Sequence, residues 1–303
     1  MKLAGIEIGG TKLQVVLGNE HGNVHKRVSH IVKASDGAVG IRGLIEQDLK
    51  TFGSLNGIGV GFGGPVNRLT GEVWTSYHVK GWTGFNVIDW LHGFSGAAVA
   101  LDNDANVAAL GESIVGAGKD HRVVFYVTLG SGVGGGVTID QKLYHGKLPG
   151  EVEIGHVRLN PSGVTIQDSC SGWAVNERVL EAAALDSTSK LAEFSKLYPG
   201  AEAKALSPAM EAHDANAQEI FDGITTDLAF GLSHVVQLFH PDTIIMGGGL
   251  SLIGEALRRK IEEKLRLYIM DAFQPGPLVQ LSRLAADAVP VGALLLAARE
   301  LSE

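Results

Sequence analysis

The amino-acid sequence predicts an α/β protein of two domains that share one architecture. The chain has 303 residues, which is more than a single hydrophobic core comfortably supports. Short apolar runs of strand length alternate with longer stretches of helical spacing. A strand, a glycine turn and a second strand occur near the N-terminus and again near the middle of the chain, which favours an internal duplication.

The first repeat begins at the N-terminus. Residues 3–8 predict a strand, Gly9-Gly10-Thr11-Lys12 a tight turn, and residues 13–18 a second strand. Because no helix follows the turn, it fits neither the P-loop nor the dinucleotide-binding fingerprint, which both need a helix N-terminus directly after their glycines. Residues 38–52 then have helical spacing, and residues 55–61 form another apolar strand.

An apolar run at residues 97–101 ends in Asp102, Asn103 and Asp104, and small helix-favouring residues follow at once. This pattern predicts a buried strand that delivers an acidic residue to the first turn of a helix. The helix dipole favours an ionised carboxylate there, and such a group can accept a proton from a substrate hydroxyl. The alternative is that Asp102 or Asp104 is only the N-cap of the helix.

The second repeat consists of a strand at residues 123–128, a glycine turn at residues 129–136 and a new strand after it. We expect the domain boundary near residues 104–118. Ser207 and Pro208 suit the cap and the first position of a long helix. The further elements predicted are helices at residues 171–185, 208–239 and 291–301 and a buried strand at residues 243–246.

Composition narrows the class of protein. Charged residues are 19% and hydrophobic residues 45% of the chain, as in an ordinary globular protein. The net charge of −8 argues against nucleic acids and anionic membranes as partners. Cys170 is the only cysteine, so neither an intrachain disulfide nor a thiolate zinc cage is available. The sequence shows neither a signal-peptide pattern nor a membrane-spanning run, and we expect a cytoplasmic protein.

Three glycine turns, each directly after a strand, predict a ligand rich in phosphate. Glycine permits the positive φ angles that point successive N–H groups at an anion, and it removes the Cβ that would block approach. One such turn by itself is more often a simple hairpin. The residues of these turns that are candidates for binding the phosphate-rich ligand, which the resemblance described below implies to be a nucleotide, are Gly9, Gly10, Thr11, Lys12, Gly130, Ser131, Gly132, Gly247, Gly248 and Gly249.

Five motifs stand in order over nearly the whole chain, at residues 5–12, 103–104, 128–134, 150–156 and 246–249. Together they resemble, in that order, the first phosphate motif, the sugar-binding Asn and catalytic Asp, the second phosphate motif, the Glu-x-Gly-His sugar site and the adenosine motif of one family. That family is the ROK family of sugar kinases and sugar-responsive repressors, within the actin-like ATPase superfamily. Each motif is weak alone, whereas the ordered set is highly specific.

The resemblance implies two RNase-H-like α/β domains with an interdomain cleft. The smaller N-terminal domain would comprise residues 1–112 joined by the C-terminal helix at 291–303, and the larger domain residues 113–290. ATP would lie against the glycine turns, and a hexose or N-acetylhexosamine would sit across the cleft. Asp104 would deprotonate the attacking hydroxyl, at C6, with Mg²⁺ and backbone donors stabilising the charge. A homodimer is the family expectation.

The sugar-binding residues that the resemblance implies are Asn103, Gly64, Glu153, His156, Gln167 and His78. His78 stands where the family tends to have Asn, and Gly63 replaces the usual proline before Gly-Pro. Glu7 replaces the commoner Asp of the first phosphate motif and could organise Mg²⁺ through water. The alternative for Glu7 is a strand-end charge that faces solvent.

The chain also departs from the family after His156, where the sequence is too short for the cysteine-rich zinc loop of many members. We therefore expect no zinc. If Ser171 and the glycine after it match the family's Ser-Gly, the sugar-binding Glu falls on Gln167, with Asp168 as an alternative substitute. His156 either bonds the sugar or satisfies a neighbouring carbonyl.

The leading function is thus an ATP-dependent sugar kinase, and the alternative is a non-catalytic sugar-binding protein or sensor on the same fold. A DNA-binding repressor is disfavoured, because the chain starts at its first strand and leaves no room for a helix-turn-helix module. Trp82 and Trp90 favour core packing over a sugar-stacking platform. Which sugar binds stays open among glucose, N-acetylglucosamine, N-acetylmannosamine, fructose and allose.

Overall fold

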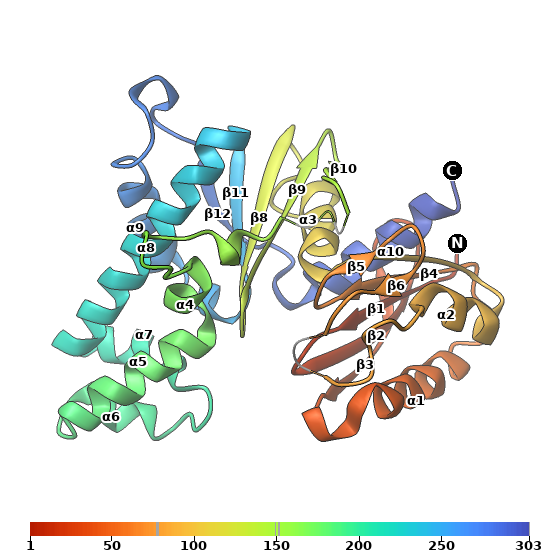
Figure 1. Cartoon of the computed structure of the whole chain (residues 1–303), viewed down its shortest axis with the longest axis horizontal. Helices are drawn as coiled ribbons and strands as arrows, with labels where there is room; N and C mark the ends of the chain where they lie inside the picture. The colour runs from red at the N-terminus through yellow and green to blue at the C-terminus, as the bar shows by residue number, and fades with distance from the viewer. Residues whose placement is uncertain (77–78, 149, 151, 303) are drawn as a thin grey trace. The chain divides into compact units, whose positions relative to one another are not determined.

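The structure is a computed structural model that describes residues 1–76, 79–148, 150 and 152–302 (Figure 1). Contacts divide the chain into two compact units. Unit 1 consists of Met1–Arg122, Gly136–Val152 and Arg283–Glu303, and unit 2 of Val123–Gly135 and Glu153–Ser282. This division differs from the predicted boundaries, since unit 1 also takes residues 113–122, 136–152 and 283–290. The reason is that the chain passes between the units four times, whereas the predicted boundaries imply two passages.

The strands are β1 (Leu3–Ile8), β2 (Lys12–Gly18), β3 (Val24–Ile31), β4 (Gly57–Phe62), β5 (Val66–Asn67), β6 (Glu72–Val73), β7 (Ala98–Asn103), β8 (Val123–Leu129), β9 (Val133–Ile139), β10 (Lys142–Leu143), β11 (Thr243–Gly247) and β12 (Leu278–Leu281).

The α-helices are α1 (Gly37–Lys50), α2 (Val87–Ser95), α3 (Asp104–Ile114), α4 (Ile166–Cys170), α5 (Gly172–Leu185), α6 (Lys190–Ser195), α7 (Leu206–Glu211), α8 (Ala215–Phe239), α9 (Glu255–Leu265) and α10 (Ala288–Glu300). Short 3₁₀ turns occur at Ala34–Asp36, Ile154–His156, Glu202–Ala205, Gly249–Ile253, Asp271–Phe273 and Ala285–Asp287. Among the described residues, no helix has the length and apolar character needed to cross a membrane.

Two five-stranded sheets repeat one topology. The first has the order β3-β2-β1-β4-β7 and the second the order β10-β9-β8-β11-β12. In the first sheet β1 runs antiparallel to β2 and parallel to β4, while in the second β11 runs parallel to both β8 and β12. Each sheet therefore combines an antiparallel edge with parallel strands joined by helical crossovers. The repeated α/β architecture predicted from the sequence is confirmed.

Both faces of the first sheet are covered by helices. Figure 1 shows α1 and α2 on one side of this sheet and α10 on the other. Ile41 of α1 and Leu91 of α2 join the same buried cluster as Ile6 of β1, whereas Leu294 of α10 packs in another cluster. Trp82 is 1% exposed within the first cluster and meets neighbouring aromatic rings edge-on. The interpretation of Trp82 as a core residue is therefore confirmed.

The C-terminal helix approaches the strands of unit 1 at glycines. A Cβ on Gly5 of β1 would stand 2.6 Å from the carbonyl oxygen of Pro290, and one on Gly59 of β4 only 1.8 Å from that of Ala293. Any side chain at these positions would hold the helix away from the sheet. Glycine is therefore what allows α10 to lie directly on β1 and β4.

The single helix predicted at residues 208–239 is wrong. Helix α7 ends at Glu211, and α8 begins at Ala215. His213 has a φ of 58°, which interrupts the helix, and the Asp214 side chain then accepts a hydrogen bond from the N–H of Ala217 and caps α8. Ser207 and Pro208 lie within the short helix α7 and do not start the long one.

Candidate active site

Asp104 is the first residue of α3, at the point where β7 delivers the chain into the helix. Its Oδ1 accepts a hydrogen bond of 2.8 Å from the N–H of Ala105. The predicted arrangement of a buried strand, an acid and a helix is confirmed. The N-cap is neither Asp102 nor Asp104, however, because Asn103 occupies that position.

Asn103 caps α3 with its side-chain oxygen, which accepts from the N–H groups of Ala105 at 2.8 Å and Asn106 at 3.3 Å. Its side-chain amide is directed elsewhere, and Nδ2 lies 3.4 Å from the carbonyl oxygen of Gly64. Asn103, Gly64 and Asp104 are therefore brought together within unit 1. Sequence reasoning named all of them but did not identify Asn103 as the cap.

The first glycine turn lies beside the Asp104 carboxylate. Within this turn, the N–H of Gly9 donates to the carbonyl oxygen of Lys12 at 2.9 Å. The N–H of Gly63, directly after β4, donates to the carbonyl oxygen of Ile8, the residue before the turn, at 2.8 Å. A Cβ built on Gly63 would stand 3.3 Å from Oδ2 of Asp104 and 3.5 Å from Cα of Gly9. The Asp104 carboxylate and the first glycine turn therefore both lie close to Gly63.

Glu7 is a partly buried group in β1, with a side chain 15% exposed. Its Oε2 accepts a hydrogen bond from Nε2 of Gln14 at 2.7 Å and lies 3.0 Å from Nζ of Lys12. The alternative that Glu7 is a strand-end charge facing solvent is therefore wrong, because the carboxylate has two partners inside the sheet. The ion pair with Glu7 also restrains the side chain of Lys12, the last residue of the first glycine turn.

The second and third glycine turns adjoin each other in unit 2. The N–H of Gly130 donates to the carbonyl oxygen of Gly132 at 2.9 Å, which closes the second turn. Gly248 has a φ of 82°, and a Cβ there would stand 2.5 Å from the carbonyl carbon of Leu129. The third turn therefore packs directly against Leu129, at the start of the second turn. Ser131 and Gly249 belong to these two turns.

The N-terminus of α5 meets the second turn. The N–H of Gly172 donates to the carbonyl oxygen of Gly130 at 2.7 Å, and the Ser171 side chain caps the helix by accepting from the N–H of Ala174. The positive end of a helix dipole therefore lies against this turn, which favours binding of an anion.

Glu153 precedes a single 3₁₀ turn in unit 2 and His156 is the last residue of that turn, and both residues are exposed. The turn packs tightly on the start of β9, since a Cβ on Gly155 would stand 2.1 Å from the carbonyl oxygen of Val133. Neither side chain makes a hydrogen bond to another described residue. His156 is therefore not occupied by a neighbouring carbonyl among the described residues.

Gln167 and Asp168 lie in α4 but have different partners. Oε1 of Gln167 accepts from the N–H of Val133 at 3.1 Å, which ties it to the end of the second glycine turn. Oδ2 of Asp168 accepts from the N–H of Thr165 at 2.9 Å and from its hydroxyl at 2.7 Å, completing a capping box. These bonds lower the pKa of Asp168, and they give it a structural role in starting α4.

His78, Cys170 and the question of a metal site complete the set of predicted positions. His78 lies outside the described residues. Cys170 is fully buried, and desolvation raises the pKa of its thiol to about 12. Within the described part of the chain, no three His, Cys, Asp or Glu side chains group as metal ligands.

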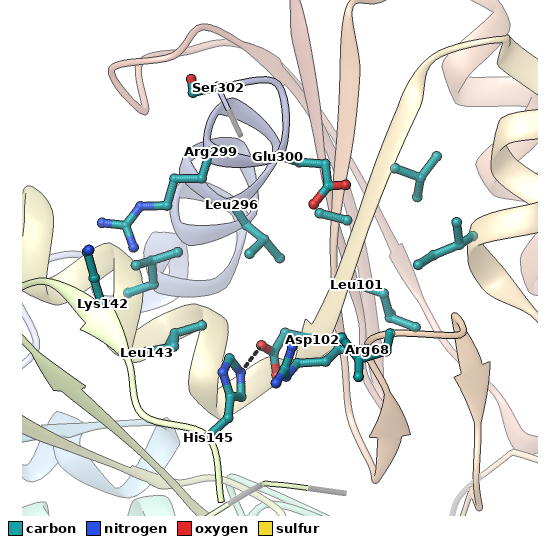
Figure 2. A pocket seen from close by; sticks show the side chains of 15 residues that line it. Arg68, Leu101, Asp102, Lys142, Leu143, His145, Leu296, Arg299, Glu300 and Ser302 are labelled. Carbon is teal, nitrogen blue, oxygen red and sulfur yellow. Dashed lines mark hydrogen bonds and ion pairs between the residues drawn. The ribbon is translucent and has the colours of Figure 1, made fainter. Parts of the chain in front are cut away.

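Sequence reasoning missed the partners of Asp102. Its Oδ2 lies 2.6 Å from Nε2 of His145, which follows β10 (Figure 2). The pair lines a cavity of about 760 Å³ in unit 1. The two residues are 43 positions apart, and no sequence pattern connects them.

The fold and these motifs define a protein of the ROK class, and the comparisons agree. The ROK family model matches residues 3–300, and the chain belongs to this family. Two relatives are kinases. The glucokinase of Thermotoga maritima is 31% identical, with the match spanning 97% of this chain and 96% of that protein. The beta-glucoside kinase of Listeria monocytogenes is 29% identical, and the match covers 83% of each.

A solved structure gives the same result for the fold. The crystal structure of a ROK family glucokinase from Streptomyces griseus, in complex with glucose and AMPPNP, superposes with a TM-score of 0.85 at 27% identity. It covers 99% of this chain and 100% of that one. The fold is that of the ROK kinases.

Proposed function

We propose that this protein is an ATP-dependent sugar kinase that phosphorylates a hexose or an N-acetylhexosamine, with Asp104 as the general base. Its similarity to glucokinases and to a glucokinase complex with glucose and AMPPNP supports the reaction class. The observation that carries the proposal is the position of Gly63, where a Cβ would stand 3.3 Å from Oδ2 of Asp104 and 3.5 Å from Cα of Gly9, so that the carboxylate and the first glycine turn both lie close to this residue. A base and a phosphate-binding turn are the two parts that phosphoryl transfer to a hydroxyl needs side by side.

Asp104 accepts the proton of the sugar hydroxyl as the oxygen attacks the γ-phosphate. Its Oδ1 accepts a hydrogen bond from the N–H of Ala105, and its Oδ2 lies close to Gly63 of the loop after β4. Asn103 holds the start of α3 with its side-chain oxygen and presents its amide N–H₂ toward Gly64. That amide group is a donor that can orient a sugar hydroxyl.

The glycine turns supply backbone N–H groups to the nucleotide phosphates. In unit 2 the second and third turns adjoin, and the N-terminus of α5 supports the second. Donors of this kind are fixed by the fold before the substrate arrives, so they stabilise the charge of the transferring phosphoryl group without reorganising. Lys12, held by Glu7, adds a positive charge beside the first turn.

Glu7 is the residue we assign to magnesium. Both of its partners contact Oε2, which leaves Oε1 to accept from a water of the metal's hydration shell. Mg²⁺ in kinases is commonly held by one or two carboxylates together with substrate phosphates and water. When bound, the ion neutralises charge on the phosphates.

Glu153, His156 and Gln167 are the proposed sugar-binding residues of unit 2. The first two are exposed and make no hydrogen bond to another described residue, so their polar atoms are available to hydroxyls. The side-chain oxygen of Gln167 accepts from the N–H of Val133, and its amide N–H₂ is the group that we assign to a sugar hydroxyl. We assign transfer to the C6 hydroxyl.

The test is turnover with ATP and Mg²⁺ on a panel of sugars, read by ADP release, with NMR of the product to locate the phosphate. Asp104→Asn should lower kcat by about 10²–10⁴-fold, the contribution typical of a general base, while sugar-dependent thermal stabilisation remains. The matched control is Asp89→Asn, which removes the same charge from the first turn of α2 and should leave kcat unchanged.

Two results would count against the proposal. Normal turnover by Asp104→Asn would show that another group removes the proton. Thermal stabilisation by a sugar without turnover on any member of the panel would favour the alternative, a non-catalytic sugar-binding protein.

A further inference from the structure

Asp102 is a buried carboxylate that the proposed reaction does not use. The residue is 3% exposed at the end of β7, directly before the cap of α3. Its Oδ1 accepts from the N–H of Asn103 at 2.8 Å and from Nδ2 of Asn106 at 2.9 Å. One oxygen thus binds the backbone of the cap residue and a side chain in the first turn of the helix.

These bonds restrain Asn103 and Asn106, the residues that lie before and after Asp104 in the first turn. Asn103 cannot rotate without breaking its bond to Asp102, and Asn106, which is fully buried, anchors the far end of the first turn. The orientation of a side chain in a helix follows from that of its backbone. Fixing the first turn therefore fixes the direction of the Asp104 carboxylate and of the Asn103 amide.

His145 holds the other oxygen of the carboxylate. Nε2 of His145 lies 2.6 Å from Oδ2, and among the described residues no other side chain contacts that oxygen. The side chains of His145 and Asp102 are 18% and 4% exposed, so the bond is largely shielded from water. A buried acceptor without a donor is costly, and a carboxylate that lost His145 would turn toward other donors.

Figure 2 shows the pair at one end of the cavity that it lines. Other charged side chains also line this cavity, namely Arg68, Lys142, Arg299 and Glu300. None of them lies within ion-pair distance of Asp102 in the described structure. Among the described side chains, His145 is therefore the one that holds Oδ2 of Asp102, while Asn103 and Asn106 hold Oδ1.

We propose that Asp102 and His145 form a positioning pair that holds the first turn of α3, and with it Asn103 and Asp104, in the orientation that sugar phosphorylation requires. This inference rests on the proposed function. Neither residue touches substrate, and both act through the backbone and cap of the helix. His145 lies two residues after the end of β10, so through this residue the chain after β10 contributes to the geometry of the base.

The central variants are His145→Leu and His145→Gln. Leucine fills the space but removes the donor, and we expect kcat to fall about tenfold to hundredfold, as small displacements of a catalytic group typically cause. The KM for the sugar should rise several-fold because Asn103 moves too, whereas the KM for ATP should stay within about twofold. Glutamine carries an N–H at a similar reach and should restore most of the activity.

Lys142→Ala is the matched control. Lys142 lines the same cavity but makes no contact with Asp102, so its kinetic constants should match those of the wild type. Activities are normalised to the folded fraction of each variant. A general loss of stability would lower that fraction. It would not lower kcat per folded molecule while leaving the KM for ATP unchanged, which is the result expected of a positioning pair.

Amide hydrogen exchange of peptides covering residues 103–108 gives a readout that does not depend on turnover. His145→Leu should exchange faster there than the wild type, while His145→Gln and Lys142→Ala should not. Unchanged exchange in His145→Leu would overturn the inference, and so would faster exchange with unchanged kcat, or failure of His145→Gln to restore activity. If the wild type phosphorylates no sugar, the proposed function fails, and the exchange rates still decide whether the pair holds the turn.

Discussion

Gly59 lies where α10 crosses β4, and replacing it by alanine tests how the C-terminal helix is attached to unit 1. A Cβ at this position would stand 1.8 Å from the carbonyl oxygen of Ala293, whereas real Cβ atoms essentially never come within 3.0 Å of a neighbour. The obstacle is backbone in the middle of a buried helix, so no side-chain rotation can relieve it. The helix and strand must separate by about 1.2 Å at this point.

The size of the effect follows from what α10 covers. Leu294 is fully buried in a cluster with Leu3 and Val16, and separating the helix from the strand opens gaps in that cluster. Overpacking in a core lowers the free energy of unfolding by about 1–3 kcal/mol and at times more. Because the carbonyl of Ala293 is part of a rigid helix, we expect Gly59→Ala to lie at the upper end of this range, at about 3 kcal/mol. At about 2–4 °C per kcal/mol for a domain of this size, Tm should fall by about 6–12 °C.

The assay is thermal unfolding followed by circular dichroism, with Gly43→Ala as the control. Gly43 lies exposed inside α1, and a Cβ there would meet nothing within 4 Å. Gly43→Ala should therefore stabilise the protein by about 0.5–1 kcal/mol, because alanine has a higher helix propensity than glycine. A Tm for Gly59→Ala within about 2 °C of the wild type would refute the reasoning from close approach.

Two further predictions concern titrating groups. Because burial raises the pKa of Cys170 to about 12, a thiol reagent at pH 8 should leave the native protein unlabelled and label it fully in denaturant; rapid labelling of the native protein would contradict this. The hydrogen bonds from Thr165 lower the pKa of Asp168, so its contribution to stability is present above the unfolded-state pKa of about 3.9 and is lost as the pH falls through the lower folded value. In an NMR titration, Thr165→Ala should move the pKa of Asp168 upward toward its ordinary range, and an unchanged value would contradict the assignment.

Several parts of the site were accessible from sequence because they depend on near neighbours. Glycines at strand ends predicted tight turns, and the structure closes the first turn with a bond between Gly9 and Lys12. The change from an apolar run to Asp102, Asn103 and Asp104 predicted the junction of strand and helix. Which of the three caps the helix was not accessible, because Asp and Asn are nearly equal as caps and tertiary partners decide between them.

Two features of the chain could not be predicted from the periodicity of its apolar residues. The helical spacing of residues 208–239 continues through the break, and only the conformation of His213 and the capping by Asp214 divide it into α7 and α8. Glu7 could be taken for a solvent-facing charge because nothing in the sequence indicates that Gln14 and Lys12 would turn toward it.

The sequence by itself determined the repeated α/β architecture, the positions of the glycine turns and the family, since each depends on local periodicity, on the backbone freedom of glycine or on ordered motifs. Only the tertiary structure decided which distant groups meet. It placed His145 against Asp102, the carbonyl of Ala293 over Gly59, and Gln167 on the end of the second glycine turn. Such contacts depend on how elements far apart in the chain pack, and packing leaves no pattern in a single sequence.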